Sequence, residues 1–123
     1  MKNSISWFEI PVKNFVKAKK FYETIFKTDM QVFEAMGMKS AFFPFDMKGG
    51  GIGGCIICGN GYKPSQSGTV VYLNGGEDLS RVLSKVEKAG GEILTPKTAM
   101  DSNGFTAFFT DTEGNKIGLH SWK

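Results

Sequence analysis

This chain is poor in the residues that most often form reactive or metal-binding sites. It has one histidine, His120, and two cysteines among 123 residues. Cys55 and Cys58 form a C-x-x-C motif, but a redox pair is expected at the start of a helix and a zinc site needs a second pair of ligands. Their segment is typical of a strand, where positions i and i+3 face opposite sides. We interpret both cysteines as small packing side chains, and nothing marks a nucleophile for a Ser–His–Asp triad.

Charge of one sign and long apolar runs are also scarce. The net charge is +3, which is too small to indicate a nucleic-acid partner. No apolar run approaches the roughly 18 residues that span a bilayer, so we expect no membrane association. The N-terminal residues 1–6 lack the apolar core of a signal peptide. We therefore expect a cytoplasmic protein.

Phenylalanine, in contrast, is abundant. The chain has 11 Phe residues, and 41% of all residues are hydrophobic, which is ordinary for a globular protein. A chain of this length forms one domain with a real core. So many aromatic rings can fill that core or line an apolar cavity.

The second half of the chain repeats the pattern of the first half. Each half contains a strand, an Asn or Asp helix cap, an amphipathic helix and three short strands. Phe15 and Leu79 occupy matching helix positions 64 residues apart. We predict an α+β fold of two βαβββ modules, residues 4–59 and 68–122, within a single domain, 1–123. Helices covering the outer face of each sheet would leave the inner faces free to curl around a shared cavity.

The expected elements follow from alternation, caps and turn residues. Asn14 is the predicted cap of the first helix and Asp78 that of the second, which Gly90 and Gly91 end. Pro96 is expected to stop a strand. The predicted strands are Ile5–Val12, Met30–Glu34, Met38–Phe43, Cys55–Cys58, Gly68–Leu73, Glu92–Thr95, Phe105–Thr110 and Lys116–Trp122.

These segments carry a family resemblance. The run from Trp7 to Val12, the spaced residues from Ala18 to Phe26, and the stretch Asp111–Ser121 resemble the vicinal oxygen chelate superfamily, in its glyoxalase-related branch. That superfamily holds glyoxalases, extradiol dioxygenases, and bleomycin and fosfomycin resistance proteins. The resemblance covers essentially the whole chain. It implies paired modules, a U-shaped cavity and frequent dimerisation, so we expect a homodimer.

The resemblance also implies where a metal would be held. In metal-dependent members, the ligands come from the first and last strands of each module. The corresponding positions here are Trp7, a position at about Val70, one near Ile56, and Gly118. Their side chains cannot ligate a divalent ion. We therefore predict no metal and no other cofactor.

Polar residues lie two positions further along these strands. Glu9 follows Trp7 and His120 follows Gly118, while Tyr72 follows Val70 if the Asn74–Gly76 stretch contains a one-residue bulge. A carboxylate, a phenol and an imidazole could then converge on one cavity. A Glu–His pair would hold one imidazole tautomer and serve as a general acid or base. The structural alternatives are a solvent-exposed or hydrogen-bonded His120 and aromatic residues that only pack.

Two functions fit these residues. The first is a glyoxalase-like protein that binds a small organic molecule in an aromatic-lined cavity, with Trp7, Glu9, Tyr72 and His120 as ligand-binding residues. The alternative is a metal-independent isomerase, lyase or epimerase, in which Glu9 or His120 is catalytic. A structural dimer without a small-molecule role is a third possibility.

Overall fold

The computed structural model describes residues 2–123 and contains two similar modules. Each has one four-stranded sheet, in the orders β1-β4-β3-β2 and β5-β8-β7-β6. The first and last strands of each module run parallel, and the other neighbours run antiparallel. This confirms the predicted α+β fold of two βαβββ modules. The first module holds β1 (Trp7–Pro11), α1 (Phe15–Phe26), β2 (Gln31–Ala35), β3 (Met38–Phe42) and β4 (Gly53–Cys58); the second holds β5 (Val71–Asn74), α2 (Ser80–Leu83), α3 (Val86–Ala89), β6 (Glu92–Ala99), β7 (Phe105–Thr110) and β8 (Lys116–Ser121).

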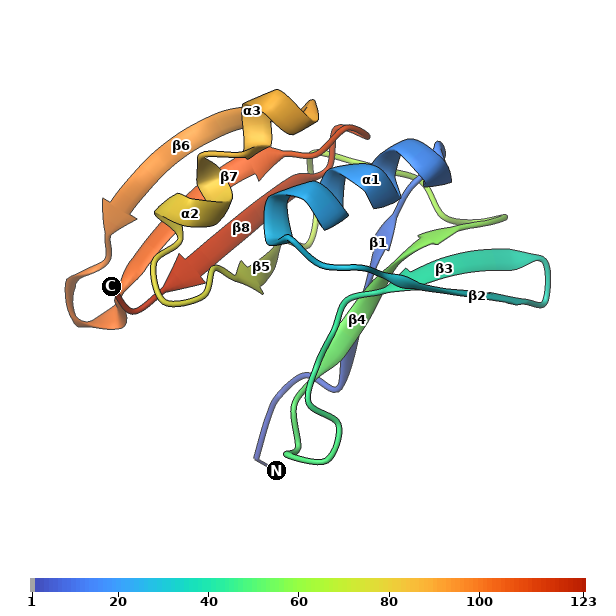
Figure 1. The fold of residues 1–123 in the computed structure, drawn as a ribbon, viewed down its shortest axis with the longest axis horizontal. Coiled ribbons are helices and arrows are strands. Elements are labelled where there is room, and N and C mark those ends of the chain that lie inside the picture. Colours follow the sequence, from blue (N-terminus) through green and yellow to red (C-terminus); the bar gives the residue numbers. More distant parts are fainter. Residues whose placement is uncertain (1) are drawn as a thin grey trace.

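Helix α1 lies between the two sheets, beside α2 and α3 (Figure 1). Its apolar stripe is buried because i, i+3 and i+4 positions share one face. The ring of Phe21 packs 5.9 Å from that of Phe109, and the ring of Tyr22 lies 5.3 Å from that of Phe43. One continuous core therefore joins both modules. The buried residues of α1 are Phe15, Ala18, Phe21, Tyr22 and Ile25.

Polar contacts reinforce this junction. The turn after β7 carries Asp111, a buried carboxylate that accepts a hydrogen bond from the Tyr22 hydroxyl of α1 at 2.7 Å. Asn115, also buried, donates to Asp111 and to the backbone oxygen of Pro11. Glu113 accepts from the backbone N–H of Lys13, ahead of α1. We call Tyr22, Asp111, Glu113 and Asn115 the intermodule clamp.

The helix of the second module differs from the sequence expectation. Instead of one helix after Asp78, the structure has α2 and α3, of four residues each. The carbonyl of Arg81 accepts from the Ser84 hydroxyl and the Lys85 ammonium. The backbone N–H of Lys85 then bonds to Val82 rather than to Arg81. Side chains have replaced the regular ladder at this point, and the helix breaks.

Strand β6 also differs, because it continues through Pro96 to Ala99. It is the edge strand of its sheet, and its pairing with β7 shifts register between Thr95 and Thr98. Proline is tolerated at edges and bulges, where its missing N–H costs no ladder hydrogen bond.

Candidate functional site

Each sheet has one face toward the core and an opposite face that the helices do not cover. We call this uncovered face the first inner face in the first module and the second inner face in the second module. On β1, Ile10 lies in the core, whereas Trp7 and Glu9 point to the first inner face and are exposed. The pairing of Glu9 with Cys55, and of Cys55 with Phe42, extends this face across β4 and β3. Alternation along the strands therefore places the predicted residues away from the core.

Four aromatic side chains form a row on the first inner face. The Trp7 ring lies 5.5 Å from that of Phe42 and 5.8 Å from that of Phe45, both edge-on. Phe42 stacks with Phe33 at 6.1 Å. Trp7 is 38% exposed and Phe33 54% exposed. We call Phe33, Phe42, Trp7 and Phe45 the aromatic row, an apolar surface open to solvent in the single chain.

A carboxylate stands beside this row. The Tyr62 hydroxyl donates a hydrogen bond to Glu9 at 2.9 Å. Tyr62 belongs to the segment between the modules, and its hydrogen bond to Glu9 raises the pKa of its phenol. Cys55 lies beside Glu9 on β4; burial, with the nearby Glu9 charge, raises its thiol pKa to about 11. The thiol is therefore neutral near pH 7, and Glu9 is the charged group of this cluster.

The second inner face has a different character. The ring of Tyr72, which is 52% exposed, lies 5.5 Å from that of Phe108. The Lys116 ammonium sits 4.7 Å from the centre of the Phe108 ring. His120 places Nε2 2.7 Å from the Asn103 carbonyl oxygen and packs edge-on against Trp122. This face therefore carries aromatic rings, an ammonium and an imidazole.

The predicted site residues thus divide between two sheets. Trp7 and Glu9 lie on the first inner face, and Tyr72 and His120 on the second. Within residues 2–123 of one chain, no hydrogen bond or ion pair joins Glu9 to His120. Sequence reasoning missed Tyr62, whose linker gave no periodic signal. It also missed Phe45, which lies in a loop after Pro44.

Strand register corrects two of the assigned metal-ligand positions. Tyr72 pairs with Gly118 as Trp7 pairs with Gly53. Tyr72, not Val70, is therefore the counterpart of Trp7. By the same pairing, Gly53 is the counterpart of Gly118. Ile56, near which that position was assigned, points into the core and is fully buried.

Both glycines are covered by aromatic rings. A Cβ built on Gly118 would lie 2.6 Å from the Tyr72 ring, and one on Gly53 would collide with the Phe45 ring. Neither position has room for a ligating side chain while its ring stays in place. Among residues 2–123, no three His, Cys, Asp or Glu side chains gather in a group able to hold an ion. The donor set of one chain therefore does not fit the metal centre that the resemblance implies.

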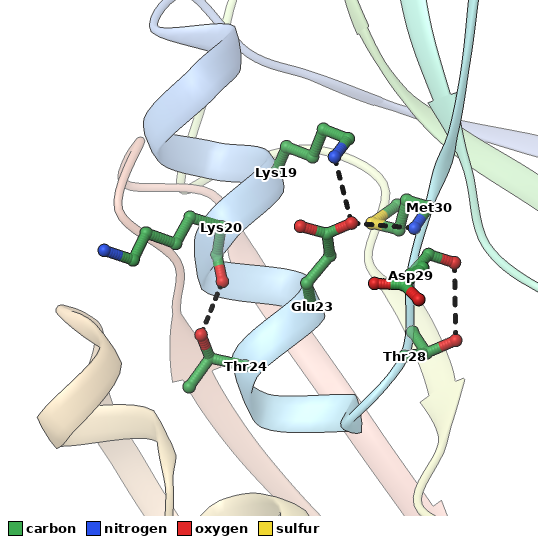
Figure 2. Close-up of polar contacts among 7 residues, drawn as sticks. All are labelled: Lys19, Lys20, Glu23, Thr24, Thr28, Asp29 and Met30. Atoms are coloured by element: carbon green, nitrogen blue, oxygen red, sulfur yellow. Dashed lines mark hydrogen bonds and ion pairs between the residues drawn. The ribbon is translucent and has the colours of Figure 1, made fainter.

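Two surface hollows are lined by residues outside the aromatic row and the predicted site. One, of about 360 Å³, is at the C-terminal end of α1, and the other, of about 460 Å³, is at the β2–β3 hairpin. Figure 2 shows the first: Glu23 accepts from the Lys19 ammonium and the Met30 N–H, and the Thr24 hydroxyl donates to the Lys20 carbonyl. The Met30 contact ties α1 to the chain that leads into β2, and the other two lie within the helix. They account for this hollow as local structure.

A family model supports the architecture directly. The model of the Glyoxalase/Bleomycin resistance protein/Dioxygenase superfamily matches residues 4–119. The chain belongs to this superfamily. In the part of the chain that the structure describes, no helix is long and apolar enough to cross a membrane. Among curated protein sequences, none matches this chain.

Several solved structures share the fold. TnmS3, an antibiotic binding protein from Streptomyces sp. CB03234, has a TM-score of 0.69 and 23% identity, with 100% of this chain and 99% of that chain covered. The fosfomycin resistance protein FosX from Listeria monocytogenes has a TM-score of 0.66 and 18% identity, with 100% and 94% covered. A glyoxalase/bleomycin resistance protein/dioxygenase family enzyme from Burkholderia phytofirmans PsJN has a TM-score of 0.68 and 12% identity, with 96% of this chain and 98% of that chain covered. At these identities the likeness concerns the fold alone.

Proposed function

We propose that this protein binds a small organic molecule on the first inner face, against the aromatic row. The observation that carries the proposal is four neighbouring rings on a sheet face opposite the core, two of them over a third exposed. Contiguous exposed apolar surface is costly and marks binding sites in soluble proteins. An antibiotic binding protein and a fosfomycin resistance protein among the structural neighbours support a small-molecule role.

We propose that this binding needs no metal and that the protein acts in the cytoplasm as a homodimer. The rings over Gly53 and Gly118 support the first part, because they occupy the space of ligating side chains. The free cysteines Cys55 and Cys58 fit a reducing compartment. A second copy would cover the aromatic faces and enclose the ligand.

Binding is favoured over catalysis by the partners of the two polar residues. Glu9 is hydrogen-bonded to Tyr62, and His120 lies against the Asn103 carbonyl. Within one chain, neither holds the other in an orientation suited to proton transfer. Measured turnover of a bound compound, lost in both Glu9→Gln and His120→Ala, would instead establish a metal-independent isomerase, lyase or epimerase.

The test is a thermal-shift screen of flat, apolar small molecules with metal-free protein. A ligand at 100 times its Kd stabilises the folded state by about 2.7 kcal/mol. Phe33→Thr should weaken binding of each hit, because Phe33 is an exposed end of the aromatic row. Val32→Thr is the matched control, since Val32 is exposed on the other face of the same strand. Equal weakening by both variants, or no hit that responds to Phe33→Thr, would contradict the assignment.

A further inference from the structure

We propose that the ligand of the first inner face is an organic cation, a protonated amine or quaternary ammonium attached to a flat apolar body. This inference rests on the proposed function and adds the charge of the ligand. It follows from how Glu9 is paired and from what surrounds it.

The Glu9 side chain is exposed, and its hydrogen-bond partner is the neutral phenol of Tyr62. None of the ion pairs found in residues 2–123 includes Glu9. A phenol donates one hydrogen bond to the carboxylate but leaves its charge in place. Since a carboxylate has about four acceptor positions, Glu9 keeps free positions for a charged donor.

The other strand positions of the first inner face carry no positive charge. Burial, with the nearby Glu9 charge, raises the pKa of the Cys55 thiol to about 11, so the thiol stays neutral near pH 7. The basic residues Lys116 and His120 belong to the other sheet, where Lys116 stacks on Phe108 and His120 contacts Asn103. The first inner face thus has a single negative charge beside Trp7.

The aromatic row strengthens the same preference. Ring faces carry partial negative charge, and cations bind over them, most strongly over tryptophan. Trp7 is two residues from Glu9 on the same face of β1, so an ammonium group between them can contact a carboxylate and an indole together. Phe42 and Phe33 then continue as the surface for the apolar body. An anion would meet repulsion from Glu9 and from the ring faces.

The experiment compares three probes that share one body: 2-naphthylmethylamine, 2-naphthalenemethanol and 2-naphthoate. Titration calorimetry with the full chain should show the amine binding about tenfold more tightly than the alcohol, since an ion pair and a cation–π contact add to the same apolar contact. The naphthoate should bind most weakly. Glu9→Gln should sharply reduce the preference for the amine over the alcohol, because the ion pair is lost. Glu87→Gln, an exposed acid on α3, is the matched control and should keep the tenfold preference.

Failure of the inference is distinguishable from failure of the proposed function. Equal binding of amine and alcohol to the unmodified protein, or tightest binding of the naphthoate, would overturn the cation assignment while small-molecule binding stood. Retention of the preference in Glu9→Gln would also overturn it. A shift from dimer to monomer in Glu9→Gln, measured by sedimentation without change in amine preference, would assign Glu9 to a partner subunit instead. No binding of these probes or of any screened compound would overturn both proposals.

Discussion

The two modules share strand order, pairing and helical cover of the core face, yet the polar groups at several counterpart positions differ. The first has an uninterrupted helix of 12 residues, whereas the second has two helices of four residues each. The turn after β7 supplies Asp111, Glu113 and Asn115 to the first module. The corresponding connection after β3, residues 43–52, contributes no such polar contact to the second module. Its Asp46 instead accepts a hydrogen bond from the nearby Gly49 N–H. The clamp is therefore one-sided.

The inner faces diverge in the same way. Counterpart positions hold Glu9 and Asn74 on the first strands, and Cys55 and His120 on the last strands. The charged and polar groups therefore differ between the faces, although both keep an aromatic ring over a glycine. The duplicated backbone thus fixes where side chains point, while the chemistry at each point is set separately by each module.

The largest expected effect comes from breaking the one-sided clamp. Asp111→Ala should lower the free energy of unfolding by about 3–5 kcal/mol, because several buried or half-buried donors lose one acceptor together. Its counterpart Asp46→Ala should cost less than about 1 kcal/mol, since Asp46 is exposed. Urea unfolding of both variants measures the contrast. Equally small losses of unfolding free energy in both variants would show that apolar packing, and not the clamp, joins the modules.

A smaller effect is expected from Tyr22→Phe, whose counterpart in the second module is the apolar Val86. Removing the hydroxyl should cost about 1.5–3 kcal/mol near neutral pH, since it donates to a buried carboxylate. Burial, reinforced by Asp111, raises the pKa of Tyr22 well above its ordinary value of 10.0. As the pH rises past 10, the unfolded chain therefore loses the Tyr22 proton before the folded chain does. The contribution of the Tyr22 hydroxyl to the free energy of unfolding then declines.

Urea unfolding at several pH values checks this second prediction. The difference between the unmodified protein and Tyr22→Phe should narrow above pH 10. A difference that stays constant to pH 11 would show that the phenol is not held by its buried environment.

The smallest effect concerns Asn14, which is the N-cap of α1 as predicted, and Asp78, which was predicted to cap the second helix but lies one residue before Leu79, the N-cap position of α2. Asn14→Ala should cost about 1 kcal/mol, because Asn14 accepts from the Lys17 N–H at the start of α1. Asp78→Ala should cost less, since it precedes a helix of only four residues. Its hydrogen bond from the Ser80 N–H, helped by Lys97, lowers the Asp78 pKa to about 2. The Asp78 contribution should therefore be complete above about pH 4 and disappear as the pH falls through 2.

Thermal unfolding between pH 2 and pH 7 measures this last contrast. The gap between Asp78→Ala and the unmodified protein should close on acidification. A gap that widens toward pH 2 would contradict the assigned direction.

The architecture was predictable because its signals are local and periodic. Alternation located most strands, and the stripe that contains Phe21 and Tyr22 located α1. The hydrogen bonds of Asp111 and Asn115 within their own turn are of the local kind that polar turn residues form. Their second set of bonds, to Tyr22 and Pro11, depends on the packing of distant elements and left no pattern in the sequence.

The candidate site was predictable only in part. Alternation placed Trp7 and Glu9 on one face of β1, as the structure does. It could not place Tyr62 or Phe45, because loops lack a period that fixes side-chain direction. The sequence prediction also assigned Val70 as the counterpart of Trp7. That assignment was counted from the matching helix positions, which do not determine how the strands pair. Whether these residues bind a ligand remains a prediction.

The ring of Tyr72 over Gly118 has an evolutionary consequence. A carboxylate introduced at Gly118 alone would collide with the phenol ring, since even a methyl group there would lie 2.6 Å from it. Removing the ring alone would open the corner without adding a donor. A lineage with this sequence would need both substitutions together to acquire a metal-holding side chain at that corner, so single mutational steps give little benefit on the way.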